Sequence, residues 1–469
     1  MALYLGVAAV GLLAFLLLQP KVKALVSYFL MMQSFNLAPA QLFGMYVWDY
    51  GAILMLVTAG EVFLFRQAAQ EPGNRGYLTA LKVFVAWLFI CFSWSLLIYQ
   101  YPILHTIKSA RYMVLGYSMT LIFIRLFSVQ PDTFEFLMKW FYRLTFALMP
   151  LCVLQYILHK PLLFAPVGDY EGALRAIPTF LPLCLLNFWI ILAKVFSSER
   201  LAVHEWVYAA LVLMTVALTY TRGIYIGVIF TIGVLVWTLS RDRMLNVGSA
   251  VIAALAAALM LIVLVASGAA DKVGGRVLSG LQLLSTSAPT SGRTRYDDTF
   301  TGRLGLAAER FSLVWAQNPI VGFGFLHEED VPAELRSNLK YGTPVGGTAG
   351  RFDSDGHYVL GLYTSDIAWA DIVISTGWIG VALLITFMLT LIFGHYLDRE
   401  IAHPMGYAVR NGLFLQLLML FLLMFDGDAF YNGVQIPAFL LAGYSLTRAR
   451  DPAKSILPAM RTRPPNLMK

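Results

Sequence analysis

The chain has 469 residues, of which 59% are hydrophobic and only 13% are charged, and its formal net charge is +7. A soluble domain carries about 25% charged residues, and its core cannot bury this much apolar surface, so the composition excludes an ordinary water-soluble protein. The positive charge needs no nucleic acid, because basic loops and a basic tail fit the anionic inner face of a membrane.

Long apolar runs follow one another along most of the chain. A membrane-spanning helix needs about 20 mostly apolar residues, and unpaired backbone groups cost too much in lipid for these runs to be irregular. We therefore expect an all-α fold, a polytopic membrane bundle of about 12–13 transmembrane helices. The predicted spans are residues 2–19, 24–40, 49–66, 80–100, 108–128, 134–158, 176–196, 203–220, 222–240, 247–267, 363–395, 408–427 and 431–447.

Basic residues gather in alternate short loops, and the positive-inside rule assigns those loops and the C-terminus to the cytoplasm. One long segment interrupts the apolar runs. The same assignment places this segment on the outer side of the membrane. The predicted organisation is N-terminal helices at 1–267, a long extracytoplasmic (periplasmic) loop at 268–362, C-terminal helices at 363–447 and a basic cytoplasmic tail at 448–469.

The long loop contains one stretch with helical periodicity. Apolar residues recur at helical spacing in LGLAAERFSLVWAQ, and Asn318-Pro319 ends this predicted helix. A loop of this length is usually functional when it is ordered. Outer loops have no need of positive charge, so its basic residues indicate an anionic partner, although a solvated face balanced by acidic residues is the alternative. These residues are Lys272, Arg276, Arg293, Arg295, Arg303, Arg310, Arg336, Lys340 and Arg351.

Arg222 is the most informative single residue. It lies between two apolar runs in LTYTRGIYIGVIF, at the predicted outer boundary of the membrane. A guanidinium stays charged there and offers a planar fork of donors that suits phosphate oxygens. The alternative is an arginine that merely snorkels to the interface.

Proton acceptors occur where the long loop becomes a helix. A positioned histidine or carboxylate can take a proton from a sugar hydroxyl, and His357 in DSDGHY and Asp366 in YTSDIAWADIVIS are the candidates. His357 could instead be a surface histidine, and Asp366 a carboxylate favoured by the helix dipole. Asp371 lies about one turn deeper, where an unpaired carboxylate is costly, so it needs an arginine partner or a function.

The remaining polar residues of the outer side indicate little. Asp426 and Asp428 in FDGDAFYNG could bind a cation, but turn geometry alone also explains them. His105 and His159 are isolated in the sequence, and no paired metal-ligand spacing is present. We therefore expect neither a cofactor nor a catalytic metal.

Several of these features occur together between roughly residues 200 and 395. TRGIYIG lies at an outer helix boundary, the long loop comes late in the chain, and GRLGLAAERFSLVWAQNPIVGFG has the form GR…W…NP..G.G. The next helix carries SDIAWADIVISTGWIG, with Gly377 and Gly380. In these features the sequence resembles the bacterial O-antigen ligase and O-antigen polymerase superfamily. The family's histidine position falls on Asp366 here, and His357 lies nine residues earlier, so the base stays open between the two.

The resemblance implies glycosyl transfer on the periplasmic face of the bacterial inner membrane. The donor would be a glycan on undecaprenyl diphosphate, held by Arg222, Arg303, Arg310 and Arg276, and the acceptor another lipid-linked glycan. Because diphosphate is a good leaving group, the reaction needs no general acid and no metal if arginines stabilise the charge. A polymerase of repeat units is the leading interpretation, and a ligase the second.

Other classes stay open. A secondary transporter for an anion would need charged residues near the middle of the membrane and matching broken helices, and a scaffold would leave Arg222 unexplained. The expected partners are the lipid-linked donor and acceptor, membrane lipids and other polysaccharide-export proteins, with no nucleic acid.

Overall fold

The computed structural model describes the larger part of the chain. The described residues are 11–31, 41–42, 45–64, 76–130, 132–158, 160, 162, 168–170, 173–175, 178, 180–196, 201–219, 222–241, 300–342, 359–363, 367–397 and 407–424. Within them the fold is helical apart from two short antiparallel ladders, β1 (Gln41–Leu42) with β2 (Met45–Tyr46), and β3 (Gly168–Tyr170) with β4 (Ala173–Arg175).

The helices follow the apolar runs closely. The predicted amphipathic helix of the long loop is confirmed as α12, which ends directly before Asn318-Pro319. The described helices are α2 (Pro20–Met31), α3 (Val47–Leu64), α4 (Gly76–Leu97), α5 (Ile103–Val129), α6 (Thr133–Leu158), α7 (Leu181–Phe196), α8 (Val203–Leu218), α9 (Arg222–Arg241), α12 (Phe300–Gln317), the 3-10 turn η1 (Glu328–Asp330), α13 (Ala333–Ser337), α14 (Ala368–Leu397) and α15 (Tyr407–Leu423).

Three described helices are long and apolar enough to cross a membrane, namely Gly76–Leu97, Thr133–Leu158 and Ala368–Gly394. The two parts of α5, Ile103–Arg111 and Met113–Val129, meet at 53° and add a fourth if they form one bent span. Only 33% of the apolar window in α4 and 28% of that in α6 is buried, so much apolar surface faces outward. The described chain is thus an all-helical protein with three or four candidate spans.

Polar and apolar side chains are distributed as lipid would require. Large apolar residues such as Phe89, Ile229 and Phe230 are exposed on α4 and α9. Some buried polar groups instead pair between helices, as where the Tyr208 hydroxyl lies 2.6 Å from Thr145 Oγ1, and others bond to carbonyls of their own helix, as Ser27 does. Because lipid offers no hydrogen bonds, polar groups that pair internally and apolar groups that face outward are typical of membrane helices.

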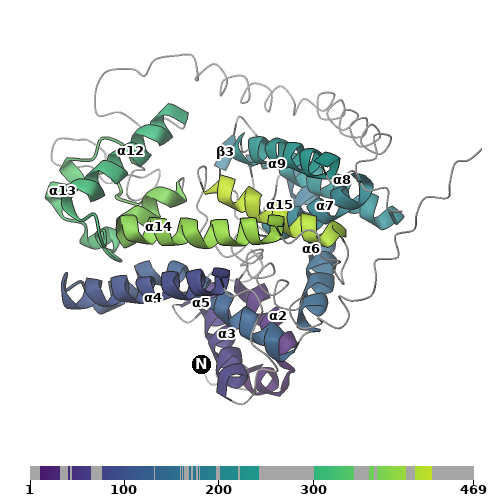
Figure 1. The fold of residues 1–469 in the computed structure, drawn as a ribbon, viewed down its shortest axis with the longest axis horizontal. Coiled ribbons are helices and arrows are strands. Elements are labelled where there is room, and N and C mark those ends of the chain that lie inside the picture. Colours follow the sequence, from purple (N-terminus) through teal and green to yellow (C-terminus); the bar gives the residue numbers. More distant parts are fainter. Residues whose placement is uncertain are drawn as a thin grey trace, which may run out of the picture.

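α14 lies between three other helices. It contacts α4, α12 and α15, and α15 in turn packs against α7 and α9 (Figure 1). Small residues allow the close approaches: a Cβ added at Gly412 would lie 2.3 Å from Ile190 Cγ1, and one at Gly227 would lie 2.7 Å from Met419. The helices around α15 therefore meet through glycine, as membrane helices commonly do.

α9 and α14 begin at the same end of α15. Gly227, near the start of α9, packs on Met419. The Trp369 ring, at the start of α14, has its centroid 5.7 Å from that of Phe421. Arg222 precedes Gly227 by five residues, or about 7.5 Å of helix. The first residues of both helices therefore lie toward the same end of α15.

Candidate functional site

The helix α14 is broken at Gly377, and the segment after α12 fills the break. Gly377 has φ +65° and ψ −172°, which no helix contains. The Phe323 N–H donates to the Ile374 carbonyl at 2.7 Å, and the Trp378 N–H donates to the Pro319 carbonyl at 2.9 Å. The two glycine motifs of the sequence, NPIVGFG and STGWIG, are therefore directly in contact.

Glycine is required on both sides of this contact. A Cβ at Gly322, whose φ is +69°, would lie 2.3 Å from the Ile374 carbonyl oxygen. A Cβ at Gly377 would lie 2.1 Å from the carbonyl oxygen of Ile320. The left-handed φ angles and the lack of space both exclude larger residues here.

Helix α4 and the residues directly after it hold the same junction from another side. The Tyr99 hydroxyl donates to the Gly322 carbonyl at 2.9 Å, and the Phe325 N–H donates to Ser95 Oγ at 2.8 Å. The indole N–H of Trp87 donates to the Thr376 carbonyl at 3.0 Å, so the carbonyl directly before the helix break has a hydrogen-bond donor. Trp87 thus bonds to the broken helix, whereas Ser95 and Tyr99 hold the segment inserted into the break.

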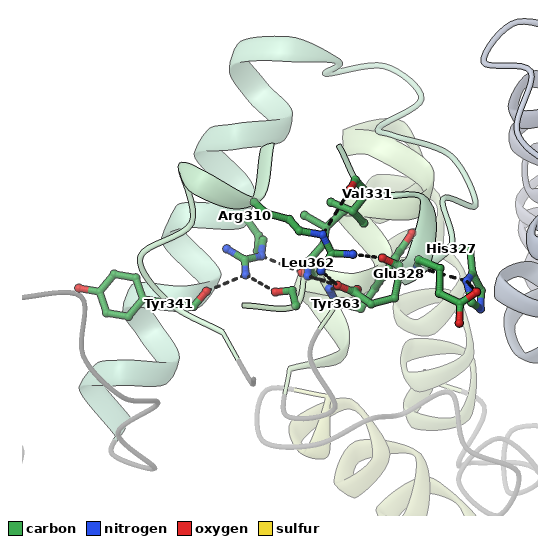
Figure 2. Close-up of polar contacts among 10 residues, drawn as sticks. Arg310, His327, Glu328, Val331, Tyr341, Leu362 and Tyr363 are labelled. Carbon is green, nitrogen blue, oxygen red and sulfur yellow. Dashed lines mark hydrogen bonds and ion pairs between the residues drawn. The ribbon is translucent and has the colours of Figure 1, made fainter. Parts of the chain in front are cut away.

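Arg310, on α12, joins three segments of the loop (Figure 2). Its Nε donates to the Leu362 carbonyl at 2.8 Å, and its Nη2 donates to the carbonyls of Tyr341 at 2.7 Å and Gly361 at 2.9 Å. Its Nη1 pairs with Glu309 at 2.6 Å, and the side chain is 0% exposed. Burial lowers the pKa of the Arg310 guanidinium, although Glu309 acts in the opposite direction.

Glu328 completes this clamp from η1. Its carboxylate accepts the backbone N–H of Leu362 at 3.0 Å and that of Tyr363 at 3.4 Å, and the side chain of Arg336 donates to it at 3.1 Å (Figure 2). The Tyr363 hydroxyl donates to the Gly324 carbonyl at 3.4 Å, and burial raises the pKa of this phenol well above its usual value. The clamp therefore fixes residues 361–363, which lead into α14.

Two histidines and two carboxylates meet beside the clamp. The His105 Nδ1 lies 2.8 Å from Asp330 Oδ2, and its Nε2 lies 3.7 Å from Glu329 Oε2. The rings of His105 and His327 stack with centroids 4.7 Å apart. Burial lowers the pKa of His327, and the neighbouring His105 acts in the same direction. This cluster ties the start of α5 to the turn η1.

The predicted site residues fall into two groups. Arg222 is the first residue of α9, and Arg303 lies in the first turn of α12, but the side chains of both lie outside the described part. Arg276, His357 and Asp366 also lie outside the described residues. Their predicted roles remain predictions.

Two of the residues singled out in the sequence, Arg310 and Asp371, are described with their side chains. Arg310 was expected to bind substrate, but its buried guanidinium is bonded to carbonyls and to Glu309, so we reassign it to holding the loop. Asp371, in the first turn of α14, is 8% exposed, and its negative charge raises the pKa of the Arg310 guanidinium.

Sequence reasoning missed the functional potential of His105, His327 and Glu328. His105 and Asp330 are 225 residues apart in the chain, so spacing cannot reveal their contact. The only available signal was the run HEED directly after the glycine motif, which places a histidine beside three carboxylates.

The comparisons with known proteins add no family. No family model matches the chain, and no curated protein matches its sequence.

Proposed function

We propose that this protein is a membrane glycosyltransferase that polymerises oligosaccharide repeat units carried on undecaprenyl diphosphate. It would build an O-antigen or exopolysaccharide on the periplasmic face of the bacterial inner membrane. The proposal keeps the bundle of about 12–13 spanning helices that the apolar runs predict. It also keeps the lipid-linked donor and acceptor as substrates, with other polysaccharide-export proteins as possible partners.

One observation carries the proposal: Arg222 and the start of α14 share one end of α15. The N-terminal turns of two long helices, one of them with an arginine, then lie toward the same end of α15, and helix N-termini favour anions. A diphosphate with a polyprenyl tail is an anion that sits at this boundary between water and lipid. The apolar outer surface of the helices suits the tail.

The chemistry follows from charge. An acceptor hydroxyl attacks the anomeric carbon, its proton goes to a base, and the carbon–oxygen bond to the diphosphate breaks. Negative charge grows on the diphosphate, so Arg222 and Arg303 would stabilise the transition state more than the ground state. His357 or Asp366 would take the proton. Arg310 and Glu328 position the segment that leads to these groups, without touching substrate.

A transporter is the second candidate, because α14 is discontinuous at Gly377 and discontinuous helices line transporter sites. Here, however, the carbonyls next to the break already accept hydrogen bonds from Phe323 and Trp87. A transported ion would have to displace these protein donors. The geometry of the break therefore favours a structural junction over a substrate site.

Reconstituted activity tests the proposal. Purified protein in lipid vesicles, supplied with repeat units on a polyprenyl diphosphate, should produce a ladder of longer lipid-linked glycans. Added Mg²⁺ or Mn²⁺ should not raise the rate. If folded protein produces no ladder, the proposal is contradicted.

Cells that lack the gene distinguish the alternatives. Single repeat units on the final acceptor indicate a lost polymerase, whereas full polymer stranded on the lipid carrier indicates a lost ligase. Normal glycans together with defective uptake or export of an anion would indicate a transporter.

A further inference from the structure

We propose that His105, His327 and Glu329 form a binding site for a divalent transition metal, with Zn²⁺ as the best fit, which fastens the turn η1 to the start of α5. One ligand atom from each residue lies within 4.8 Å of the others. This proposal does not depend on the proposed enzymatic function, because none of the three residues is among those predicted to bind the donor or to take the proton.

The distances fit a zinc ion after a small closure. Zinc binds histidine nitrogen and carboxylate oxygen at about 2.0–2.2 Å, which separates tetrahedral ligands by about 3.4 Å. Here the Glu329 Oε2 lies 3.7 Å from His105 Nε2 and 3.9 Å from His327 Nδ1. These two carboxylate–imidazole pairs therefore exceed the ideal separation by only a few tenths of an ångström, and the ligand atoms of the two histidines lie within 4.8 Å of each other.

Asp330 supplies the second observation. Its two carboxylate oxygens lie 3.0 and 2.8 Å from the Nδ1 of His105, which assigns the proton to that nitrogen. The lone pair is then on Nε2, the atom that faces Glu329. Metal-bound histidines almost always donate their second ring N–H to a carboxylate, a backbone carbonyl or water, and Asp330 would take that role for His105.

To bind a metal, His327 must exchange one hydrogen bond for a bond to the ion. Its Nδ1 accepts the Glu329 N–H at 3.3 Å, a long hydrogen bond that metal coordination would replace. Two histidines and one carboxylate leave the fourth position for water. Softer sulfur ligands are absent from this cluster, and the imidazoles disfavour Mg²⁺ and Ca²⁺, which prefer oxygen ligands.

The consequence would be mechanical. η1 also carries Glu328, whose carboxylate holds the backbone of Leu362 and Tyr363. A metal ion between His105 and η1 would therefore brace the clamp that leads into α14. Zinc should raise the thermal unfolding temperature of the metal-free protein, since a ligand that binds the folded state stabilises it.

Metal titration of full-length, tag-free protein in detergent tests the site. After EDTA treatment and desalting, calorimetry should find one saturable Zn²⁺ per chain, and Co²⁺ should give the visible absorption of a site with nitrogen and oxygen ligands. His105→Ala and His327→Ala should each weaken zinc binding at least tenfold. Asp330→Asn should weaken it about 10–100-fold, as expected for an orienting carboxylate.

Two further variants keep the test decisive. Glu329 is largely exposed, so Glu329→Gln should fold normally and still lose at least tenfold in affinity. His204, an exposed histidine on α8, is the matched control, and His204→Ala should bind zinc like the wild type. The proposal is overturned if the wild type shows no saturable zinc binding, if Mg²⁺ or Ca²⁺ binds equally well, or if His204→Ala weakens binding as much as Glu329→Gln does.

Discussion

Two parts of this molecule are stabilised in different ways. Around α15, helices meet through apolar side chains and glycines such as Gly227 and Gly412. Around α12 and the start of α14, charged side chains instead bond to backbone groups of neighbouring loops, with Arg310 and Glu328 at the centre. Apolar packing needs only shape, whereas the loop region depends on a few polar side chains that have no substitute. Single polar changes should therefore damage the second part most.

The largest stability effect should come from Arg310→Met. This change keeps much of the side-chain volume, but it leaves three carbonyls without their donor in a buried place and removes the ion pair with Glu309. Breaking a buried pair in this way costs about 3–5 kcal/mol. Thermal and denaturant unfolding of the purified protein in detergent measures the loss.

Lys21→Met is the matched control for Arg310→Met. Lys21 pairs with Asp132 at 2.5 Å, but the aspartate side chain is 62% exposed. Exposed ion pairs contribute about 0–1 kcal/mol. Equal losses from the two variants would show that the clamp contributes no more than a surface pair.

Activity should respond most to Arg222→Lys. Lysine keeps the charge but loses the planar fork that binds two phosphate oxygens at once. Loss of a transition-state donor typically lowers the rate about 10²–10³-fold. The ladder assay in vesicles gives the rate, and the unfolding temperature should stay near that of the wild type. Arg241→Lys, at the opposite end of α9, should leave the rate unchanged. Wild-type rates for Arg222→Lys would remove this arginine from the proposed site.

The next-largest loss of stability should come from substitutions at the break in α14. Gly377→Ala and Gly322→Ala should each destabilise the protein, because both residues have a left-handed φ and no space for a Cβ. Backbone strain alone costs about 1–3 kcal/mol. Gly233→Ala in α9 is the control, since its added Cβ would meet nothing within 4 Å and alanine favours a helix. If all three variants unfold alike, the close contact at Gly377 is not important for stability.

Much of the helical architecture could be predicted, because long apolar runs have few alternatives. The run predicted at 134–158 is α6 (Thr133–Leu158), and that at 222–240 is α9. α14 begins at Ala368 and not at 363, because the backbone of residues 361–363 is bonded to Arg310 and Glu328. The runs predicted at 247–267 and 431–447 lie outside the described residues.

The site was harder to predict, because its contacts are distant in sequence. Arg310 reaches partners 31 and 52 residues away, and nothing in the sequence separates a buried arginine from the other basic residues of the loop. The stacked pair of His105 and His327 also depends on how α5 approaches η1. By contrast, the two glycine motifs were recognisable as local patterns, although their contact with each other was not.

The smallest effect should come from Trp87→Phe, which removes one donor and keeps an aromatic ring. The indole N–H of Trp87 donates to the Thr376 carbonyl one residue before the break in α14. Its loss should cost about 0.5–1.5 kcal/mol, the usual net contribution of one hydrogen bond. Trp206→Phe on α8 is the control, because the Trp206 side chain is 41% exposed. Unfolding in detergent should rank Trp87→Phe below Trp206→Phe in stability, and the difference should disappear in the background of Gly377→Ala if Trp87 and Gly377 support the same junction. An undiminished difference in that background would mean that Trp87 stabilises α4 and α14 independently of the break.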